Sequence, residues 1–126
     1  MAITHTIQQG WQGNSNTPSL YTSQAIVGGR EANCDEATPN STTTGVVIAI
    51  PTSTLLSLYI VSTVNTTLKT NSSGSPDQTF TLAGGVPFVW VGGSGVTNPI
   101  TTAVTELFSD VGGTVDGVLS VRSLAS

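Results

Sequence analysis

Charged side chains are scarce in this sequence, and their scarcity excludes several classes of protein. Only 8% of the residues are charged, whereas an average globular domain has about 25%. The cations Arg30, Lys69 and Arg122 lie far apart in the sequence, so no cluster is available to displace the counterions of a nucleic acid. We therefore expect no binding to DNA or RNA. The net charge of −4 is spread too thinly to indicate a particular partner.

Cysteine, long apolar runs and helix-forming residues are also scarce. The one cysteine, Cys34, cannot form a disulfide within the chain, so we expect stability to come from packing. No secretion signal opens the sequence, and the longest apolar run, residues 45–50, is too short to cross a bilayer. We therefore expect a soluble protein that is made in the cytoplasm and does not enter a membrane. With one Lys, two Arg and three Glu, long amphipathic helices are nearly excluded.

Hydroxyl side chains supply the polarity that charges do not. The chain has 21 Thr and 15 Ser, and β-branched Thr favours a half-exposed pleated sheet over a helix. Short apolar segments follow one another at intervals of about 8–12 residues, separated by turn-forming residues, which is typical of a sandwich or barrel. We predict one all-β domain over residues 1–126. Its fold is expected to be an antiparallel β-sandwich or jelly-roll-like barrel of about eight short strands with long loops.

The segment 70–91 is the predicted centre of this core. Turn-forming residues at 71–77 separate two extended segments, and Gly84-Gly85 separates residues 79–82 from residues 86–91. Because side chains alternate along an extended chain, both of the last two segments can turn large apolar side chains to one interior. We predict that they form a hairpin at the centre of the antiparallel core. The predicted core residues are Val47, Ile48, Leu58, Ile60, Phe80, Leu82, Phe88, Trp90, Leu119 and Val121.

Other segments complete the predicted strand set. The continuous apolar run at 45–50 predicts a strand buried on both faces. Residues 30–44 are predicted to be a long irregular connection with at most a short strand near Glu31, and residues 52–56 suit one helical turn. The remaining strands are expected at 3–11, 20–27, 57–63, 64–70 (the last two being separate or one bent strand), 103–109 and 115–124.

Residues that could carry catalysis or bind a metal are few. His5 is the only histidine and lies among threonines in a predicted strand, so we assign it a structural or solvent-facing role. Cys34 is surrounded by carboxylates, which raise the pKa of a thiol and weaken it as a nucleophile. Glu31, Asp35 and Glu36 form a solvated loop, the simpler interpretation, or a calcium site without EF-hand spacing. We expect no catalytic residue, cofactor or resident metal, because phosphate-binding glycine motifs and a paired acid and base are missing.

Four aromatic residues are candidates for a platform that binds a sugar or a protein: Trp11, Tyr21, Tyr59 and Trp90. Trp90 is in phase with the apolar side chains of its predicted strand, which places it in the core. Trp11 ends a polar strand beside a loop, and we expect it to be the exposed anchor of a binding surface.

The segment from Tyr59 to Trp90, including LKTNSSGSPDQTFTLAGGVPFVW, resembles small virion proteins of tailed bacteriophages, in particular capsid decoration (cement) proteins. The resemblance covers only that segment and brings no catalytic residues. It implies a small β-sandwich or barrel on the capsid surface of the virion. Such a protein clamps neighbouring subunits of the major capsid protein and associates with copies of itself, often as a trimer.

The N-terminal segment is the part expected to reach a partner. We predict an extended arm at residues 1–12, which can add a strand to the sheet edge of a neighbour. The predicted partner interface consists of Ile3, His5, Ile7, Trp11, Tyr21 and Arg30. Two alternatives remain open at this point: a tail or head-to-tail component of the same kind of particle, and a carbohydrate- or receptor-binding sandwich. An enzyme is the least favoured alternative.

Overall fold

A computed structural model describes residues 2–13 and 18–126 of the chain. Over these residues the protein is all β, with ten strands that pair antiparallel and no helix. The strands are β1 (Ile3–Trp11), β2 (Leu20–Gly28), β3 (Arg30–Thr38), β4 (Thr42–Ile50), β5 (Leu55–Ser62), β6 (Thr66–Thr70), β7 (Thr79–Leu82), β8 (Phe88–Val91), β9 (Val104–Val111) and β10 (Gly117–Ala125).

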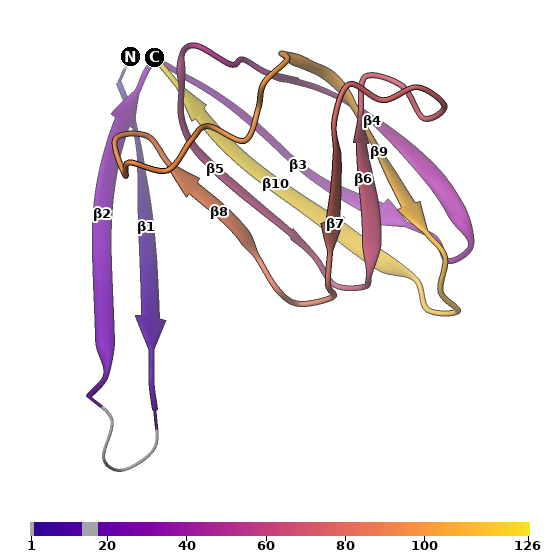
Figure 1. The fold of residues 1–126 in the computed structure, drawn as a ribbon, viewed down its shortest axis with the longest axis horizontal. Helices are drawn as coiled ribbons and strands as arrows, with labels where there is room; N and C mark the ends of the chain where they lie inside the picture. The colour runs from indigo at the N-terminus through magenta and orange to yellow at the C-terminus, as the bar shows by residue number, and fades with distance from the viewer. Residues whose placement is uncertain (1, 14–17) are drawn as a thin grey trace.

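Eight of the strands form two four-stranded sheets that pack face to face (Figure 1). Sheet I has the order β3-β10-β5-β8, and sheet II has the order β4-β9-β6-β7. Most connections cross from one sheet to the other, and this strand order is that of a jelly roll. The remaining strands, β1 and β2, form a separate two-stranded hairpin that runs away from the sandwich. The predicted all-β sandwich is therefore confirmed.

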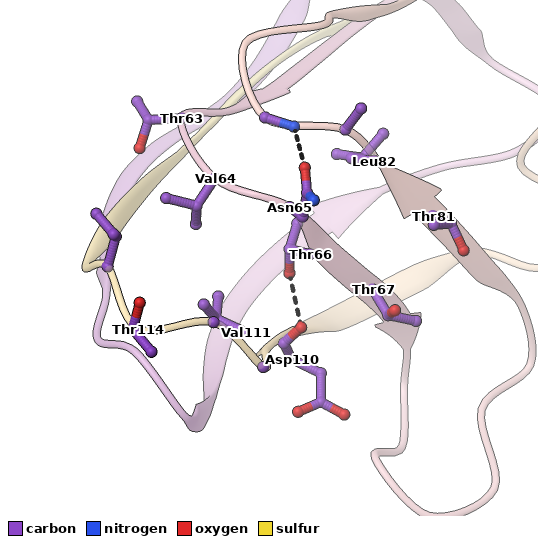
Figure 2. A pocket seen from close by; sticks show the side chains of 15 residues that line it. Thr63, Val64, Asn65, Thr66, Thr67, Thr81, Leu82, Asp110, Val111 and Thr114 are labelled. Carbon is purple, nitrogen blue, oxygen red and sulfur yellow. Dashed lines mark hydrogen bonds between the residues drawn. The ribbon is translucent and has the colours of Figure 1, made fainter.

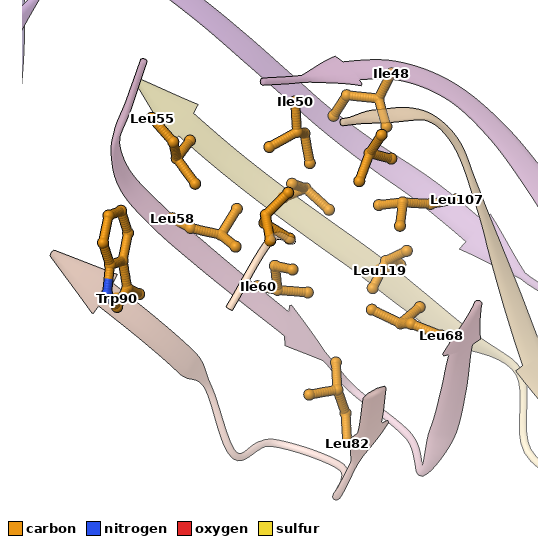
Figure 3. Close-up of a cluster of buried hydrophobic side chains, with 13 residues drawn as sticks. Ile48, Ile50, Leu55, Leu58, Ile60, Leu68, Leu82, Trp90, Leu107 and Leu119 are labelled. Atoms are coloured by element: carbon orange, nitrogen blue, oxygen red, sulfur yellow. The ribbon is translucent and has the colours of Figure 1, made fainter. Parts of the chain in front are cut away.

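The core lies between the two sheets and is built from the inward-facing half of each strand (Figure 3). Leu58, Leu119 and Val121 on the central strands of sheet I are fully buried, and Leu68 on β6 meets them from sheet II. Burying apolar area of this kind contributes roughly 25 cal/mol per Å². The core cluster comprises Ile48, Ile50, Leu55, Leu58, Ile60, Leu68, Leu82, Trp90, Ile100, Val104, Leu107, Leu119 and Val121.

Two of the predicted core residues lie at the margin of this cluster. Phe80 on β7 and Phe88 on β8 are half-buried and pack against it. Their ring centroids are 5.8 Å apart with an interplanar angle of 53°, so the two rings close one side of the core between the sheets. The structure buries the predicted core residues Ile48, Leu58, Ile60, Leu82, Trp90, Leu119 and Val121.

The prediction that Val47 lies in the core is wrong. Its side chain is 86% exposed, whereas its neighbours Val46 and Ile48 are buried. β4 is an edge strand of sheet II, and the outer face of that sheet is uncovered, so only alternate residues reach the core. A run of apolar residues therefore does not mean here that a strand is buried on both faces.

The predicted hairpin between residues 79–82 and 86–91 is also wrong. β7 pairs with β6 in sheet II, and β8 pairs with β5 in sheet I, so the two segments are edge strands of different sheets. The chain changes sheet through a turn in which Val86 N donates to Ala83 O (3.1 Å) and Gly85 adopts a φ of 77°. Both segments still point apolar side chains into one interior, but from opposite walls.

The irregular connection predicted at 30–44 is a strand, a turn and the start of another strand. β3 covers nine residues, and the chain reverses at Ser41, which has a φ of 53°. The inward positions of β3 hold small residues such as Ala32 and Cys34. The alternation of apolar and polar residues that predicts a strand is therefore weak in this segment. The helical turn suggested at 52–56 is a tight turn closed by Leu55 N donating to Thr52 O (3.3 Å).

Replacing Trp90 with alanine tests the core. Trp90 is 8% exposed and its Nε1 donates to Val96 O (2.9 Å), so the variant loses both packing and a buried hydrogen bond. We expect Trp90→Ala to lower the free energy of unfolding by about 3–5 kcal/mol in urea denaturation. The matched control is Trp11→Ala, because Trp11 is 54% exposed and should change stability by less than about 0.5 kcal/mol. Equal stabilities of the two variants would contradict this placement.

Candidate functional site

The β1–β2 hairpin belongs to neither of the two sheets that form the sandwich. Its register is regular over nine pairs, from Ile3 opposite Gly28 to Trp11 opposite Leu20. Alternate residues of a strand point to the same side of a sheet, so Ile3, His5 and Ile7 share one face. These three are half-buried, whereas most of the remaining strand residues of the hairpin are exposed.

The root of the hairpin is held tightly against the end of β10. A Cβ atom at Gly28 would lie 2.6 Å from Ala125 O and 2.8 Å from the Leu124 side chain, so only glycine fits there. The next residue, Gly29, donates its N–H to Ala125 O at 2.9 Å. Leu124 is fully buried as a result. The hairpin therefore leaves the sandwich in a defined direction.

A second contact ties β1 to β3 through a charged hydrogen bond. His5 Nε2 lies 2.8 Å from Glu31 Oε2 and donates to it, because an ionised carboxylate only accepts. This hydrogen bond is the main reason that the pKa of Glu31 lies below its ordinary value of 4.5; a hydrogen bond from Asn33 lowers it further. The structure thus gives His5 a positioning role at the root of the hairpin.

A groove of about 490 Å³ separates the hairpin from the outer face of sheet I. One wall consists of five consecutive residues of β1, Thr4 to Gln8, and the other of Ser57, Tyr59 and Arg122. Consecutive residues of a strand point to opposite faces, so a groove that touches all five runs along the unpaired edge of β1. Arg122 is fixed in the opposite wall by Asp35, whose two carboxylate oxygens lie 3.0 and 2.8 Å from its Nη2.

The far end of the hairpin exposes large apolar side chains. Trp11 is 54% exposed, and Leu20 and Tyr21 are each 66% exposed. Trp11 and Leu20 are opposite each other and share a face, whereas Tyr21 pairs with Gly10 and points to the other face. Residues 1–29 contain no Asp, Glu, Lys or Arg. The end of the hairpin is therefore an uncharged surface with apolar side chains on both faces.

The predicted partner interface divides between the two ends of this hairpin. Trp11 and Tyr21 lie exposed at its far end, whereas Ile3, His5 and Ile7 are half-buried on the face that contains the Glu31 contact. Arg30 is exposed beside the C-terminus, where its Nη2 donates to Ser126 O at 3.2 Å. The expected arm at 1–12 is one strand of a hairpin that extends to Gly28. Sequence reasoning did not single out Leu20, although its pairing with Trp11 follows from the hairpin register.

The acidic segment around Cys34 has other partners. Cys34 is a free, half-buried thiol, and burial, followed by the charges of Asp35 and Glu36, raises its pKa. The predicted direction is confirmed, although burial is the larger cause. Glu31 bonds to His5 and Asp35 bonds to Arg122. Within residues 2–13 and 18–126, no three His, Cys, Asp or Glu side chains gather where they could hold a metal ion.

A cleft of about 850 Å³ lies at the end of the sandwich where residues 63–67, 81–84 and 110–115 meet (Figure 2). Its polar groups are used within the fold: Gly84 N donates to Asn65 Oδ1 (2.8 Å), and Thr66 Oγ1 bonds to Ser109 Oγ (2.8 Å). Asp110, the only carboxylate in its lining, accepts from Thr43 Oγ1 (2.9 Å) and lies 3.4 Å from Lys69 Nζ. The cleft lining contains neither an aromatic ring nor a histidine. It therefore offers neither a sugar platform nor an acid–base pair.

Substitution at Gly28 tests the seat of the hairpin. In Gly28→Ala the new methyl group collides with the backbone of Ala125, so the hairpin has to move away from β10. We expect a loss of about 1–3 kcal/mol in unfolding free energy, with faster hydrogen exchange at the amides of the hairpin root. Gly29→Ala is the matched control, because its nearest heavy atom would be 3.9 Å away. A Gly28→Ala variant as stable and as protected as the control would disprove the seat.

An NMR titration tests the contact between His5 and Glu31. The pKa of Glu31 is lowered in the folded protein. The ionised carboxylate therefore stabilises the fold above pH 4.5, and this stabilisation is lost as the pH falls through the lower pKa of the folded state. In His5→Ala we expect the Glu31 midpoint to rise towards 4.5. Asp35 is the internal control, because its pKa is lowered mainly by Arg122 and should not change in the same variant. An unchanged Glu31 midpoint would rule out the contact in solution.

No helix of the described residues is long and apolar enough to span a membrane. Comparison of the chain with protein-family models, with curated proteins and with solved structures gives no match. The function is therefore inferred from the geometry and chemistry of this chain, and the hairpin is the site that they single out.

Proposed function

We propose that this protein is a structural subunit that binds other protein surfaces in a larger assembly, using the β1–β2 hairpin as its binding arm. The observation that carries this proposal is the exposed end of the hairpin, where Trp11, Leu20 and Tyr21 extend from an uncharged ribbon that is held at its root. Aromatic side chains are favoured anchors at protein interfaces, and a preorganised arm loses little entropy on binding.

The composition of the surface supports the same function. With 8% charged residues and many Thr and Ser, broad faces can be covered by another protein without stripping water from ionised groups. A single arm makes a small contact, and repetition over many copies in an assembly multiplies its effect through avidity. An enzyme would require a reactive pair, and His5 and Cys34, the residues such a mechanism would need, have structural partners or a raised thiol pKa.

The specific form that we propose is decoration of a bacteriophage capsid. The resemblance of residues 59–90 to tailed-phage decoration proteins supports it, and so does the jelly-roll strand order, because that fold is common in viral capsid proteins. Many unrelated functions share the jelly roll, so the fold supports the proposal by analogy. On this proposal the partners are the major capsid protein and further copies of the chain, and the location is the capsid surface of the virion. A tail or head-to-tail component is the alternative within the same class.

A carbohydrate-binding module is the alternative from another class, since lectins also use the jelly roll. A sugar platform needs aromatic rings on one surface. Trp11 and Tyr21 lie on opposite faces of the hairpin, Tyr59 is half-buried, and Trp90 is buried. The structure therefore favours a protein partner over a glycan.

Co-sedimentation with capsids tests the proposed function. Purified chain is mixed with expanded capsids assembled from the major capsid protein of the same genome, and the bound fraction is measured across a dilution series. We expect saturable binding, and a loss of about tenfold or more in affinity for the Trp11→Ala/Leu20→Ala double variant. Val47→Ala is the matched control, because it removes an apolar side chain that is exposed on the sandwich.

Three results would count against the proposal. Absence of binding by the unaltered chain would exclude capsid decoration. Equal binding by the double variant and the control would exclude the hairpin as the arm. Binding of the isolated chain to a glycan array, lost in Trp11→Ala, would favour the carbohydrate-binding alternative.

A further inference from the structure

The free edge of β1 lacks the features that normally prevent one sheet edge from pairing with another. Edge strands are usually protected by charged residues, proline or a β-bulge. β1 contains no Asp, Glu, Lys, Arg or Pro, and its nine-residue register with β2 shows no bulge. Alternate residues of β1 direct their backbone N–H and C=O groups away from β2. This edge is therefore able to accept another strand.

The groove beside that edge provides space for the incoming strand. It runs along Thr4 to Gln8 and has a volume of about 490 Å³, with Tyr59 and Arg122 on the opposite wall. Because its lining joins β1 to Ser57, Tyr59 and Arg122, the groove is on the side of the hairpin that faces sheet I. An extended segment in this position would bond to the backbone of β1 and contact sheet I at the same time.

The sequence of β1 is complementary to itself in the antiparallel direction. When two copies of β1 run antiparallel about Ile7, Ile7 faces Ile7 and Ile3 faces Trp11. On the same face His5 then meets Gln9, so apolar residues meet apolar ones and polar residues meet polar ones. The strand has no charged residue that such a register would place against its own copy.

We propose that the groove is occupied by β1 of a second copy of this chain, so that two hairpins form a continuous four-stranded antiparallel sheet with the order β2-β1-β1-β2. The inference rests on the proposed function of the hairpin as a protein-binding arm, and it names one partner of that arm. The antiparallel register brings Trp11 of each copy next to Ile3 of the other, at the seated root. Trp11 gains an apolar neighbour in this register, while Leu20 and Tyr21 are on β2 and lie outside the new strand pair. The pairing gives dimers, in place of the trimer that the resemblance implies.

Charge also favours a second copy as the occupant. The net charge of the chain is −4, and every Asp and Glu lies after residue 29. Two copies that meet through their hairpins therefore place no Asp, Glu, Lys or Arg of one hairpin against the other.

Light scattering and cysteine cross-linking test the pairing with no capsid present. We expect the mass of a dimer that dissociates on dilution, with a dissociation constant raised about tenfold or more in Ile7→Lys, since the two lysines would face each other. In a Cys34→Ser background, Ile7→Cys should form an intermolecular disulfide on mild oxidation, because facing Cβ atoms lie about 5 Å apart. The matched control is Thr22→Cys on β2, which is exposed and should cross-link far more slowly.

The outcomes separate this inference from the proposed function. A monomer or a trimer at all concentrations, or equal cross-linking at positions 7 and 22, would overturn the pairing of β1 strands. If such a chain still bound capsids through Trp11 and Leu20, the proposed function would stand without the dimer. If the Ile7→Cys chain formed the disulfide-linked dimer but bound capsids in neither its oxidised nor its reduced form, the pairing would stand and decoration would be excluded.

Discussion

Burial of apolar side chains between two facing sheets is the interaction on which the rest of this structure depends. The chain has no disulfide within it, and its described residues contain no helix and only a few ion pairs, all of them partly exposed to solvent. Leu58, Leu68 and Leu119 are fully buried from both sides of the interior, and the jelly-roll order brings their strands together. Most connections in this order lead from one sheet to the other, so the two sheets have to form together. Each sheet buries its apolar face only against the other.

Hydroxyl groups make many of the side-chain hydrogen bonds of this protein, in which charged residues are few. The buried Thr66 and Ser109 hydroxyls lie 2.8 Å apart, and the Ser123 hydroxyl donates to Ala32 O at 2.9 Å. Such bonds satisfy polar groups inside a sheet without the cost of burying an ion. The abundance of Thr and Ser therefore serves the interior as well as the surface. It leaves outer faces that another protein can cover with little desolvation.

The β1–β2 hairpin differs from the sandwich because its apolar side chains are not buried between two sheets. This difference points to a role in binding. The inner face of the hairpin is half-buried only near the root, where Gly28 and His5 hold it, and its far end carries Trp11 and Leu20 without cover. An isolated two-stranded ribbon is marginally stable in water, so the contacts of Gly28 and His5 at the root are needed to hold the hairpin against the sandwich. Large apolar side chains at the end of such an element are expected where a partner completes the surface.

The sequence by itself determined the class of fold, the burial of residues such as Leu58 and Trp90, and the absence of charge from the first strands. These properties are local, because composition, β propensity and alternation depend only on residues that are close in the sequence. Only the tertiary structure decided which strands pair. Residues 79–82 and 86–91 were predicted to form a hairpin, yet they became edges of opposite sheets, because pairing is chosen by whole-sheet packing rather than by the intervening turn. Val47 is exposed for a related reason, since whether a face of a sheet is covered depends on elements far away in the sequence. The pairing of the N-terminal strand with β2 was likewise decided by the tertiary structure.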